Sequence, residues 1–386
     1  MNNGGGPVFA LVAGEDSGDL LGAELIEALR TLHQDARFVG VGGPRMRAVG
    51  FEAWHDISEL SVMGLAEVAR HLLRLLHLRA SLAGRLLKLK PDVFVGIDAP
   101  DFNLGLEKKL KRAGIRTAHY VSPSIWAWRE HRAKKIGMSA ELLLCLFPME
   151  PEIYARHGVD ARFVGHPLAD RFPLVSDRAA ARETLDLPQD VPILAVLPGS
   201  RRSEIHRLGS IFLDAADRVR EQIPGLQIVI PAANVQCRKM IEKILRKPLR
   251  SALLLDGHAH RAMAAADVIL LASGTAALEA MLAKRPMVVG YRLSAMTYRI
   301  LRSLNLLKTQ AYALPNILAG HALVPELMQN ECTAENLAME VMRLFHEPGR
   351  RATMVNAFER MHLGLHKGGG AATAAARAIA ELLPAR

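Results

Sequence analysis

Short apolar runs alternate along the chain with segments in which apolar residues recur at helical spacing. In the first half the runs include Val8–Ala13 and Asp92–Ile97, and in the second half Ile193–Leu197 and Val268–Ala272. Continuous apolar runs of this length are typical of strands buried on both faces of a parallel sheet. The alternation predicts an α/β fold of two Rossmann-like parallel-sheet domains in tandem, facing a central cleft.

The alternation is interrupted once, between about residues 165 and 190. Gly165–Leu168 is typical of a hinge, and Arg171–Asp190 of a linker with a helical piece. Because 386 residues can bury two full cores, we expect an N-terminal domain over residues 1–172 and a C-terminal domain over residues 173–360. Residues 361–386 are predicted to be helical. They are expected to cross back to the N-terminal domain or to pack on another chain.

The segment Asp267–Tyr291 has the pattern strand, tight turn, helix, strand. The small residues Ser273–Thr275 let a ligand approach the backbone, and the N–H groups at the start of the next helix favour a phosphate or pyrophosphate. Glu279 lies about one turn further, within reach of a sugar or ribose hydroxyl. Taken alone, the segment is equally compatible with an ordinary βαβ connection.

Three other loops carry polar residues after a predicted strand. The Gly-Ser-Arg turn in Pro198–Glu204 combines backbone N–H groups with a guanidinium and is a candidate anion site. The acidic residues of Gly14–Asp19 are suited to binding sugar hydroxyls. Alternatively, they cap the following helix and stabilise the turn. Asp98–Asn103 places carboxylates at a strand end, where open α/β sheets carry out chemistry, although acidic residues are also common in turns.

Composition narrows the classes of partner. The formal net charge of +10 and the pI of about 9.7 predict a surface that attracts anions. Aromatic residues make up only 5% of the chain, which argues against base stacking on nucleic acid. Three scattered cysteines indicate a reducing compartment and no structural zinc. No signal-peptide pattern or bilayer-length apolar run is found, so we expect a cytosolic protein.

A basic amphipathic stretch, Met63–Lys90, is the strongest candidate for a special surface. Leu65, Val68, Leu72 and Leu76 recur at helical spacing, with arginines on another side. Such a segment can lie in a membrane interface, or it can form two ordinary helices that pack on the sheet. Tyr291–Lys308 has a similar character.

Several motifs are absent from the sequence. There is no P-loop, no tight GxGxxG with an acidic residue at the proper distance, no D-x-D pair, no H-E-x-x-H and no paired-cysteine metal site. Kinase-like ATPase and hydride-transfer chemistry are therefore disfavoured. A donor diphosphate would be held by Arg201, helix N-termini and backbone amides, with no divalent ion and no cofactor.

Eight segments, in one order along almost the whole chain, resemble the lipid-A-disaccharide synthase family, which has the two-domain architecture called GT-B. They are LVAGEDSGDLLGA (Leu11–Ala23), FVGVGGPRM (Phe38–Met46), PDVFVGIDAPDFN (Pro91–Asn103), HYVSPSIWAWR (His119–Arg129), GHPLAD (Gly165–Asp170), LPGSRRSEI (Leu197–Ile205), LASGTAALEAMLAKRPMVVGYR (Leu271–Arg292) and LPNILAG (Leu314–Gly320).

The resemblance implies an inverting glycosyl transfer. UDP-2,3-diacylglucosamine would donate its sugar to the 6-hydroxyl of 2,3-diacylglucosamine 1-phosphate, giving UDP and a β(1→6)-linked disaccharide 1-phosphate. Asp98 is the implied base. The implied donor-site residues are Gly199, Ser200, Arg201, Ser273, Gly274, Thr275, Glu279, Tyr291, Arg292 and Asn316. Those implied for the acceptor or donor sugar are Glu15, Ser17, Asp19 and Trp126.

Doubly acylated sugars do not readily leave a bilayer, since each buried methylene contributes about 0.8 kcal/mol. Basic residues near an anionic leaflet add roughly 1 kcal/mol each. We therefore expect peripheral binding to the cytoplasmic face of the anionic inner membrane. The residues expected at this surface are Met63, Leu72, Leu73, Arg74, Leu75 and Leu76.

Two other classes of function stay open on the sequence. One is a different GT-B enzyme, such as a UDP-N-acetylglucosamine epimerase or the transferase that acts on a lipid-linked peptidoglycan precursor. The other is a non-enzymatic basic adaptor for membrane or nucleic acid, which is disfavoured because polar residues concentrate at strand ends and not along one basic face. The oligomeric state is not fixed by the sequence, and a homo-oligomer is kept among the expected partners.

Overall fold

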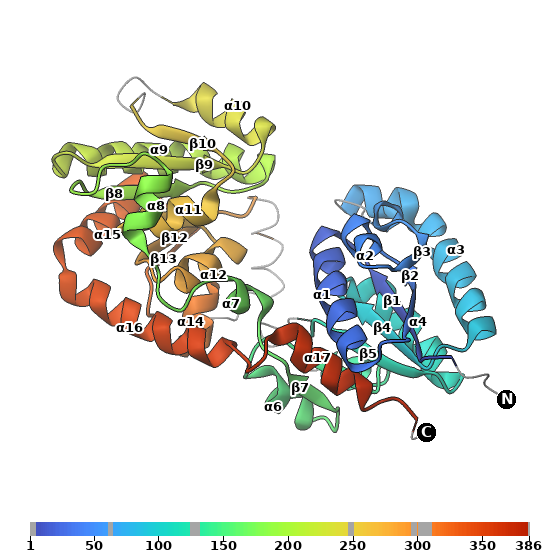
Figure 1. Ribbon diagram of the computed structural model, residues 1–386. Coiled ribbons are helices and arrows are strands. Elements are labelled where there is room, and N and C mark those ends of the chain that lie inside the picture. The colour runs from blue at the N-terminus through green and yellow to red at the C-terminus, as the bar shows by residue number, and fades with distance from the viewer. Residues whose placement is uncertain are drawn as a thin grey trace. The chain divides into compact units, whose positions relative to one another are not determined.

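The computed structural model describes residues 5–60, 65–123, 132–245, 251–294, 299 and 311–384. For residues 65–72 it describes the backbone only. The chain divides into two compact units, which we treat separately. The first contains Met1–Asp170 together with Leu365–Arg386, and the second contains Arg171–Gly364. Each unit is one parallel β-sheet with helices packed against it (Figure 1).

The first unit has a seven-stranded parallel sheet in the order β3-β2-β1-β4-β5-β6-β7. Its strands are β1 (Val8–Ala13), β2 (Arg37–Val41), β3 (Glu52–His55), β4 (Val93–Ile97), β5 (Arg116–Tyr120), β6 (Leu142–Cys145) and β7 (Ala161–Phe163). The strand order reverses at β1 and β4, which pair in register from Phe9↔Val93 to Ala13↔Ile97. The loops after β1 and β4 therefore leave the same edge of the sheet side by side, the position where open α/β sheets bind ligands.

The helices of the first unit are α1 (Asp16–Leu32), α2 (Pro44–Ala48), η1 (Ile57–Glu59), α3 (Leu65–Leu89), α4 (Pro100–Arg112), α5 (Ala133–Gly137), α6 (Glu150–Ala155), α7 (Pro167–Arg171, ending at the unit boundary) and α17 (Ala371–Ala380). Helix α1 begins earlier than its apolar pattern indicates, since Asp16 and Asp19 occupy its first turn, where acidic side chains favour the positive end of the helix dipole.

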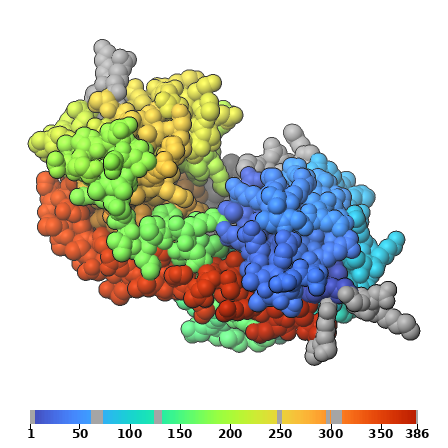
Figure 2. All heavy atoms as spheres, viewed as in Figure 1, coloured from blue at the N-terminus to red at the C-terminus, as the bar shows by residue number. Residues whose placement is uncertain are grey.

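The C-terminal helix α17 packs on α1, although the two are more than three hundred residues apart in the chain. The red C-terminal residues lie against the blue N-terminal ones in Figure 2. At the base of this contact, the Asp170 carboxylate accepts a hydrogen bond from the Ala371 N–H at 2.6 Å and pairs with His366 at 3.0 Å. Helix α17 thus belongs to the first unit, although the second unit precedes it in the chain.

Helix α3 is one continuous helix of 25 residues, so the alternative of two helices over Met63–Lys90 is wrong for the described part. Its second half buries Leu82, Ala83 and Leu86 in the core cluster of the first unit. Its first half leaves Leu73 72% and Leu76 40% exposed. Among the described helices, none combines the length and the apolar character that a bilayer span requires.

The second unit has a six-stranded parallel sheet in the order β10-β9-β8-β11-β12-β13. Its strands are β8 (Ile193–Leu197), β9 (Gln227–Ala232), β10 (Leu253–Asp256), β11 (Val268–Ala272), β12 (Met287–Tyr291) and β13 (Glu326–Met328). Its helices are α8 (Arg178–Thr184), α9 (Arg202–Gln222), α10 (Val235–Ile244), α11 (Ala259–Ala265), α12 (Thr275–Leu282), α14 (Leu314–Ala319), α15 (Ala334–His346) and α16 (Pro348–Leu365).

The strand order of the second sheet reverses at β8 and β11, which are neighbours in the sheet. As in the first unit, the loops that follow these two central strands open at one edge. The strands themselves are fully buried, as their uninterrupted apolar sequences predict. Each sheet therefore presents one loop pair at its reversal point: residues after Ala13 and Ile97 in the first unit, and after Leu197 and Ala272 in the second.

Candidate functional site

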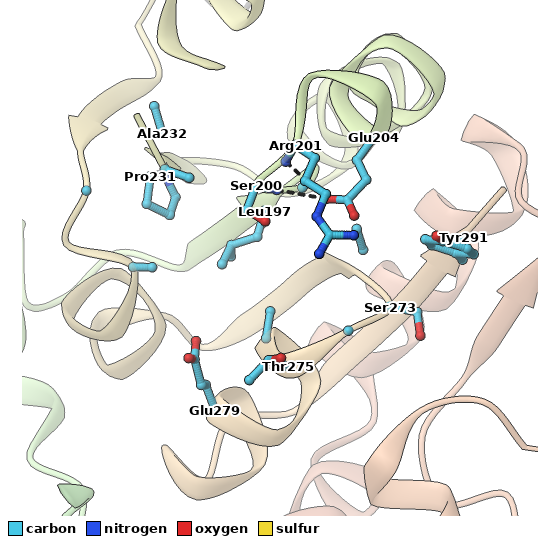
Figure 3. A pocket seen from close by; sticks show the side chains of 17 residues that line it. Leu197, Ser200, Arg201, Glu204, Pro231, Ala232, Ser273, Thr275, Glu279 and Tyr291 are labelled. Carbon is cyan, nitrogen blue, oxygen red and sulfur yellow. Dashed lines mark hydrogen bonds between the residues drawn. The ribbon is translucent and has the colours of Figure 1, made fainter. Parts of the chain in front are cut away.

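A cavity of about 400 Å³ lies in the second unit at the ends of β8, β9, β11 and β12. Figure 3 shows the side chains that line it, which come from the loops before α9, α11 and α12 as well as from the strands. Eight of the ten predicted donor-site residues lie on its wall: Gly199, Ser200, Arg201, Ser273, Gly274, Thr275, Glu279 and Tyr291.

The loop between β8 and α9 is held by Glu204. Its carboxylate accepts hydrogen bonds from the backbone N–H groups of Ser200 at 2.9 Å and Arg201 at 3.2 Å (Figure 3, dashed lines). Gly199 has φ +131°, and a Cβ there would lie 2.5 Å from the Glu204 Cβ, so only glycine fits this turn. Glu204 lines the cavity but was not predicted; the signal for it is a glutamate three residues after Arg201, a spacing from which its carboxylate can reach back to the N–H groups before α9.

The loop between β11 and α12 forms the facing wall of the cavity. Ser273, Gly274 and Thr275 place the first turn of α12 at the cavity, where the free N–H groups of a helix start favour negative charge. The guanidinium of Arg201 extends into the space between this turn and the start of α9 (Figure 3). A guanidinium and two helix N-termini on one cavity make it suited to a diphosphate.

Glu279 adds a carboxylate to the same wall. It lies one turn into α12, where the predicted spacing placed it, and it pairs with His260 at 3.4 Å. The hydrogen bond and charge of Glu279 raise the pKa of the His260 imidazole. The Glu279 carboxylate lines the cavity, and its oxygens are chemically suited to accept hydrogen bonds from sugar or ribose hydroxyls.

The other two predicted donor-site residues, Arg292 and Asn316, are not among the described residues that line the cavity. Arg292 donates through Nε to the Gln329 carbonyl at 3.0 Å. Asn316 is buried and ties α14 to the next segment: its Oδ1 accepts from the N–H groups of Leu323 and Val324 at 2.8 Å, and its Nδ2 donates to Glu326 at 2.7 Å. The amide of Asn316 is thus fully occupied by the fold.

In the first unit, the loop after β4 holds Asp98 in an unusual backbone conformation. Asp98 and Ala99 have φ +52° and +43°, two successive residues in the left-handed region. Such conformations cost on the order of 1–3 kcal/mol each and persist only where neighbouring contacts fix them. Here the Asp98 N–H donates to the Tyr120 carbonyl at 2.8 Å, and the Asn103 amide donates to the Asp98 carbonyl at 2.9 Å.

The carboxyl of Asp98 is partly buried, and burial raises its pKa. The nearby Glu15 carboxylate raises the pKa further, while the His119 imidazole acts in the opposite direction. The two loops touch, since a Cβ at Gly14 would lie 2.5 Å from the Ala99 Cβ. Ser17 donates to Glu15 at 2.8 Å, so the structure gathers Asp98, Glu15 and Ser17 at one sheet edge.

Asp19 has a different position. It is 2% exposed, and its carboxylate accepts hydrogen bonds from the backbone N–H groups of Gly43 at 2.7 Å, Arg45 at 2.9 Å and Met46 at 3.1 Å. These contacts hold the start of α2. Of the two roles that the sequence left open for the acidic residues of this loop, Asp19 has the capping role, and its oxygens are used within the fold.

Because three backbone N–H groups depend on it, two of them buried, Asp19→Ala is expected to lower the free energy of unfolding by about 2–4 kcal/mol. Urea unfolding followed by circular dichroism measures the effect. Asp16→Ala is the matched control, since Asp16 is exposed in the same helical turn and should change stability by less than about 1 kcal/mol. Equal stabilities of the two variants would contradict the capping role.

Several residues of the predicted membrane surface and sugar site lie outside the described residues: Met63, Trp126 and the side chain of Leu72. Leu73 and Leu76 are exposed on α3, and Leu75 is half-buried. Arg74 is exposed, and its guanidinium donates to the Glu59 carbonyl at 2.9 Å. Most of Tyr291–Lys308 also lies outside the description. Across the described part of the chain, no three His, Cys, Asp or Glu side chains are grouped as metal ligands would be.

Comparison with known proteins places the chain in one family. The sequence profile described as "Lipid-A-disaccharide synthetase" matches residues 9–379. The lipid-A-disaccharide synthase of Xanthomonas campestris pv. campestris (strain 8004) is 56% identical over 383 residues, which cover 98% of this chain and 87% of that protein.

Solved structures with lower identity share the fold. The UDP-GlcNAc 2-epimerase from Neisseria meningitidis bound to UDP-GlcNAc superposes with a TM-score of 0.62 at 12% identity, covering 97% of this chain and 98% of that one. CalG4, the calicheamicin glycosyltransferase, gives a TM-score of 0.62 at 17% identity, covering 99% of both chains. These likenesses establish a GT-B fold of two parallel-sheet α/β units, while the profile and the sequence identity establish the family. The chain belongs to the lipid-A-disaccharide synthase family and is a glycosyltransferase of lipid A biosynthesis.

Proposed function

We propose that the chain transfers the sugar of UDP-2,3-diacylglucosamine to the 6-hydroxyl of 2,3-diacylglucosamine 1-phosphate with inversion at the anomeric carbon. The observation that carries this proposal is the cavity in the second unit, where the Arg201 guanidinium and two helix N-termini gather at the reversal point of the sheet. That arrangement stabilises the negative charge that develops on a departing diphosphate. The structure of the N. meningitidis epimerase, which has the same fold, is bound to UDP-GlcNAc.

Within this cavity we assign the diphosphate to Arg201 and the start of α12. Glu204 already uses the N–H groups of Ser200 and Arg201, so these two amides are not free donors while that contact persists. Glu279 would accept hydrogen bonds from the ribose, and Tyr291 would border the uracil. With these assignments, the main contact of the departing diphosphate is its ion pair with the Arg201 guanidinium.

In the first unit we assign the proton acceptor to Asp98. As the 6-oxygen of the acceptor bonds to the anomeric carbon, its proton passes to the Asp98 carboxylate, and the bond between the anomeric carbon and the diphosphate oxygen breaks to release UDP. A raised pKa makes this carboxylate a stronger base near neutral pH than an ordinary aspartate. One displacement on the α-linked donor gives the β product.

Transfer of radiolabelled sugar from the acylated UDP donor to the acylated sugar phosphate, with EDTA present, tests the proposal. We expect a labelled disaccharide 1-phosphate and stoichiometric UDP. Epimerised UDP-sugar as the product, or transfer only to a lipid-linked peptidoglycan precursor, would replace the proposed substrates with those of another GT-B enzyme.

The exposed leucines of α3 are proposed to hold the enzyme on the cytoplasmic face of the inner membrane. The double variant Leu73→Ser/Leu76→Ser should lower partitioning onto phosphatidylglycerol vesicles about tenfold or more, because each buried leucine contributes about 1.5–3 kcal/mol. Co-sedimentation measures the partition coefficient. Leu363→Ser is the matched control, since Leu363 is 59% exposed in the second unit. Undiminished partitioning of the folded double variant would exclude this surface.

A further inference from the structure

A buried carboxylate–imidazole pair lies in the first unit, on the elements that flank the Asp98 loop. Glu107 comes from α4 and His119 from β5, and both are 0% exposed. The Nδ1 of His119 and the Oε1 of Glu107 are 2.6 Å apart. Two titratable side chains removed completely from water cost several kcal/mol of desolvation before their attraction is counted, and apolar residues would fill the space at no such cost.

The strand beside the pair is adapted to it. Gly96 of β4 is in register with His119, and a Cβ at position 96 would lie 2.1 Å from the Glu107 Oε1. Any larger residue at 96 would therefore expel the carboxylate from its place. The neighbouring strand thus provides the space that the pair occupies.

The pair is not fully satisfied by the fold. Glu107 Oε2 and His119 Nε2 are buried and have no hydrogen-bond partner among the described residues, and the same holds for Asn103 Oδ1. Buried polar atoms without partners are rare in native proteins and commonly mark a functional site. A purely structural pair would be expected to satisfy its second nitrogen and its second oxygen.

Residues beside the pair contact the backbone of Asp98. Asn103 lies one turn before Glu107 on α4, and its amide donates to the Asp98 carbonyl. Asp98 is bonded through its N–H to Tyr120, the residue after His119. The groups whose charges reach the Asp98 carboxyl are Glu15 from the β1–α1 loop and His119 from β5, and Glu107 of α4 faces His119.

We infer that Glu107 and His119 are positioning residues for Asp98: Glu107 fixes the imidazole, and the imidazole favours the ionised form of the base before it takes the acceptor proton. The inference rests on the proposed function in one respect: the proposed reaction identifies the proton that Asp98 accepts. The proton still passes from the 6-hydroxyl to Asp98, and His119 and Glu107 exchange none with the substrate.

The inference makes opposite predictions for the two neighbours of Asp98. His119→Asn removes the imidazole that lowers the pKa of the Asp98 carboxyl. It should therefore move the acidic limb of kcat/KM to higher pH by about one unit, so that activity below the limb falls about tenfold. Glu107→Gln should move the limb in the same direction, because the carboxylate that fixes the His119 imidazole is lost. Glu15→Gln removes a repelling charge and should move the limb to lower pH. For the His119 and Glu107 variants, KM above the limb should change less than about twofold.

Thr117→Val is the matched control, because Thr117 is a buried polar neighbour on β5 that carries no charge. Its pH profile should be that of the unaltered enzyme. An unchanged limb in folded His119→Asn and Glu107→Gln, or equal shifts in Thr117→Val, would overturn the inference.

A second readout does not depend on turnover. With ¹³C-carboxyl-labelled aspartate, the Asp98 resonance is assigned by its absence in Asp98→Asn, and its titration is followed by NMR. It should titrate at higher pH in His119→Asn and Glu107→Gln than in the unaltered protein. If the enzyme fails to transfer the proposed sugar but the titration shifts, the proposed function fails and the coupling stands. If the titration does not shift, the coupling fails whatever the reaction.

Discussion

Asp98→Asn is expected to lower turnover by about 10²–10⁴-fold, because the amide cannot accept the proton of the attacking hydroxyl. The side chain keeps its size, and the Asp98 backbone contacts to Tyr120 and Asn103 do not involve the carboxylate. UDP affinity, measured by isothermal titration, should be unchanged, since the cavity lies in the other unit. Turnover within about threefold of the unaltered enzyme would remove Asp98 as the base.

The same substitution should stabilise the protein at neutral pH. The folded-state pKa of Asp98 is raised, so ionisation of this carboxyl opposes folding. That penalty is absent below the unfolded pKa and fully present above the folded pKa. Asp98→Asn, which cannot ionise, should therefore unfold at a higher urea concentration than the unaltered protein near pH 7, and the difference should disappear in acid. Loss of activity together with a gain in stability separates a catalytic role from misfolding.

Arg201→Ala is expected to lower kcat/KM by about 10²–10³-fold, because it removes the cation that faces the departing diphosphate. UDP affinity should fall with it, which distinguishes this variant from Asp98→Asn. Steady-state kinetics with the acylated UDP donor and titration with UDP provide the two measurements. The backbone N–H of Arg201 still bonds to Glu204 in the variant, so the start of α9 should stay intact.

Arg202→Ala is the control for charge alone. Arg202 is the next residue, is exposed, and is not among the described residues that line the cavity. Its removal lowers the net charge equally but should change kcat/KM by less than about threefold. Equal losses in both variants would show that general electrostatic attraction, and not a guanidinium placed at the cavity, supports activity.

The sequence carried enough information for the two sheets and for most of the cavity wall. Strands β8 and β11 are buried on both faces and carry only apolar residues, so they stand out as apolar runs, and small and polar residues gather in the turns that follow them. Because parallel strands end at one edge, Arg201 and Thr275 were predictable as neighbours on one cavity.

Other features depend on contacts that no local pattern reveals. The edge strands β3 and β13 are four and three residues long and half-buried, so they lack a continuous apolar run. Asn316 was expected at the nucleotide, but its amide is used by the segment after α14. Glu107 and His119 lie twelve residues apart on different elements, and only the packing of α4 on β5 brings them to hydrogen-bonding distance.

The return of α17 to the first unit sets an order for folding during synthesis. Domains near the N-terminus generally fold first as the chain emerges from the ribosome. Helix α17, which covers α1, and the two partners of Asp170, Ala371 and His366, emerge only after the whole of Arg171–Gly364. The nascent first unit must therefore wait with one helix face exposed, while the second unit already has every residue it needs to fold.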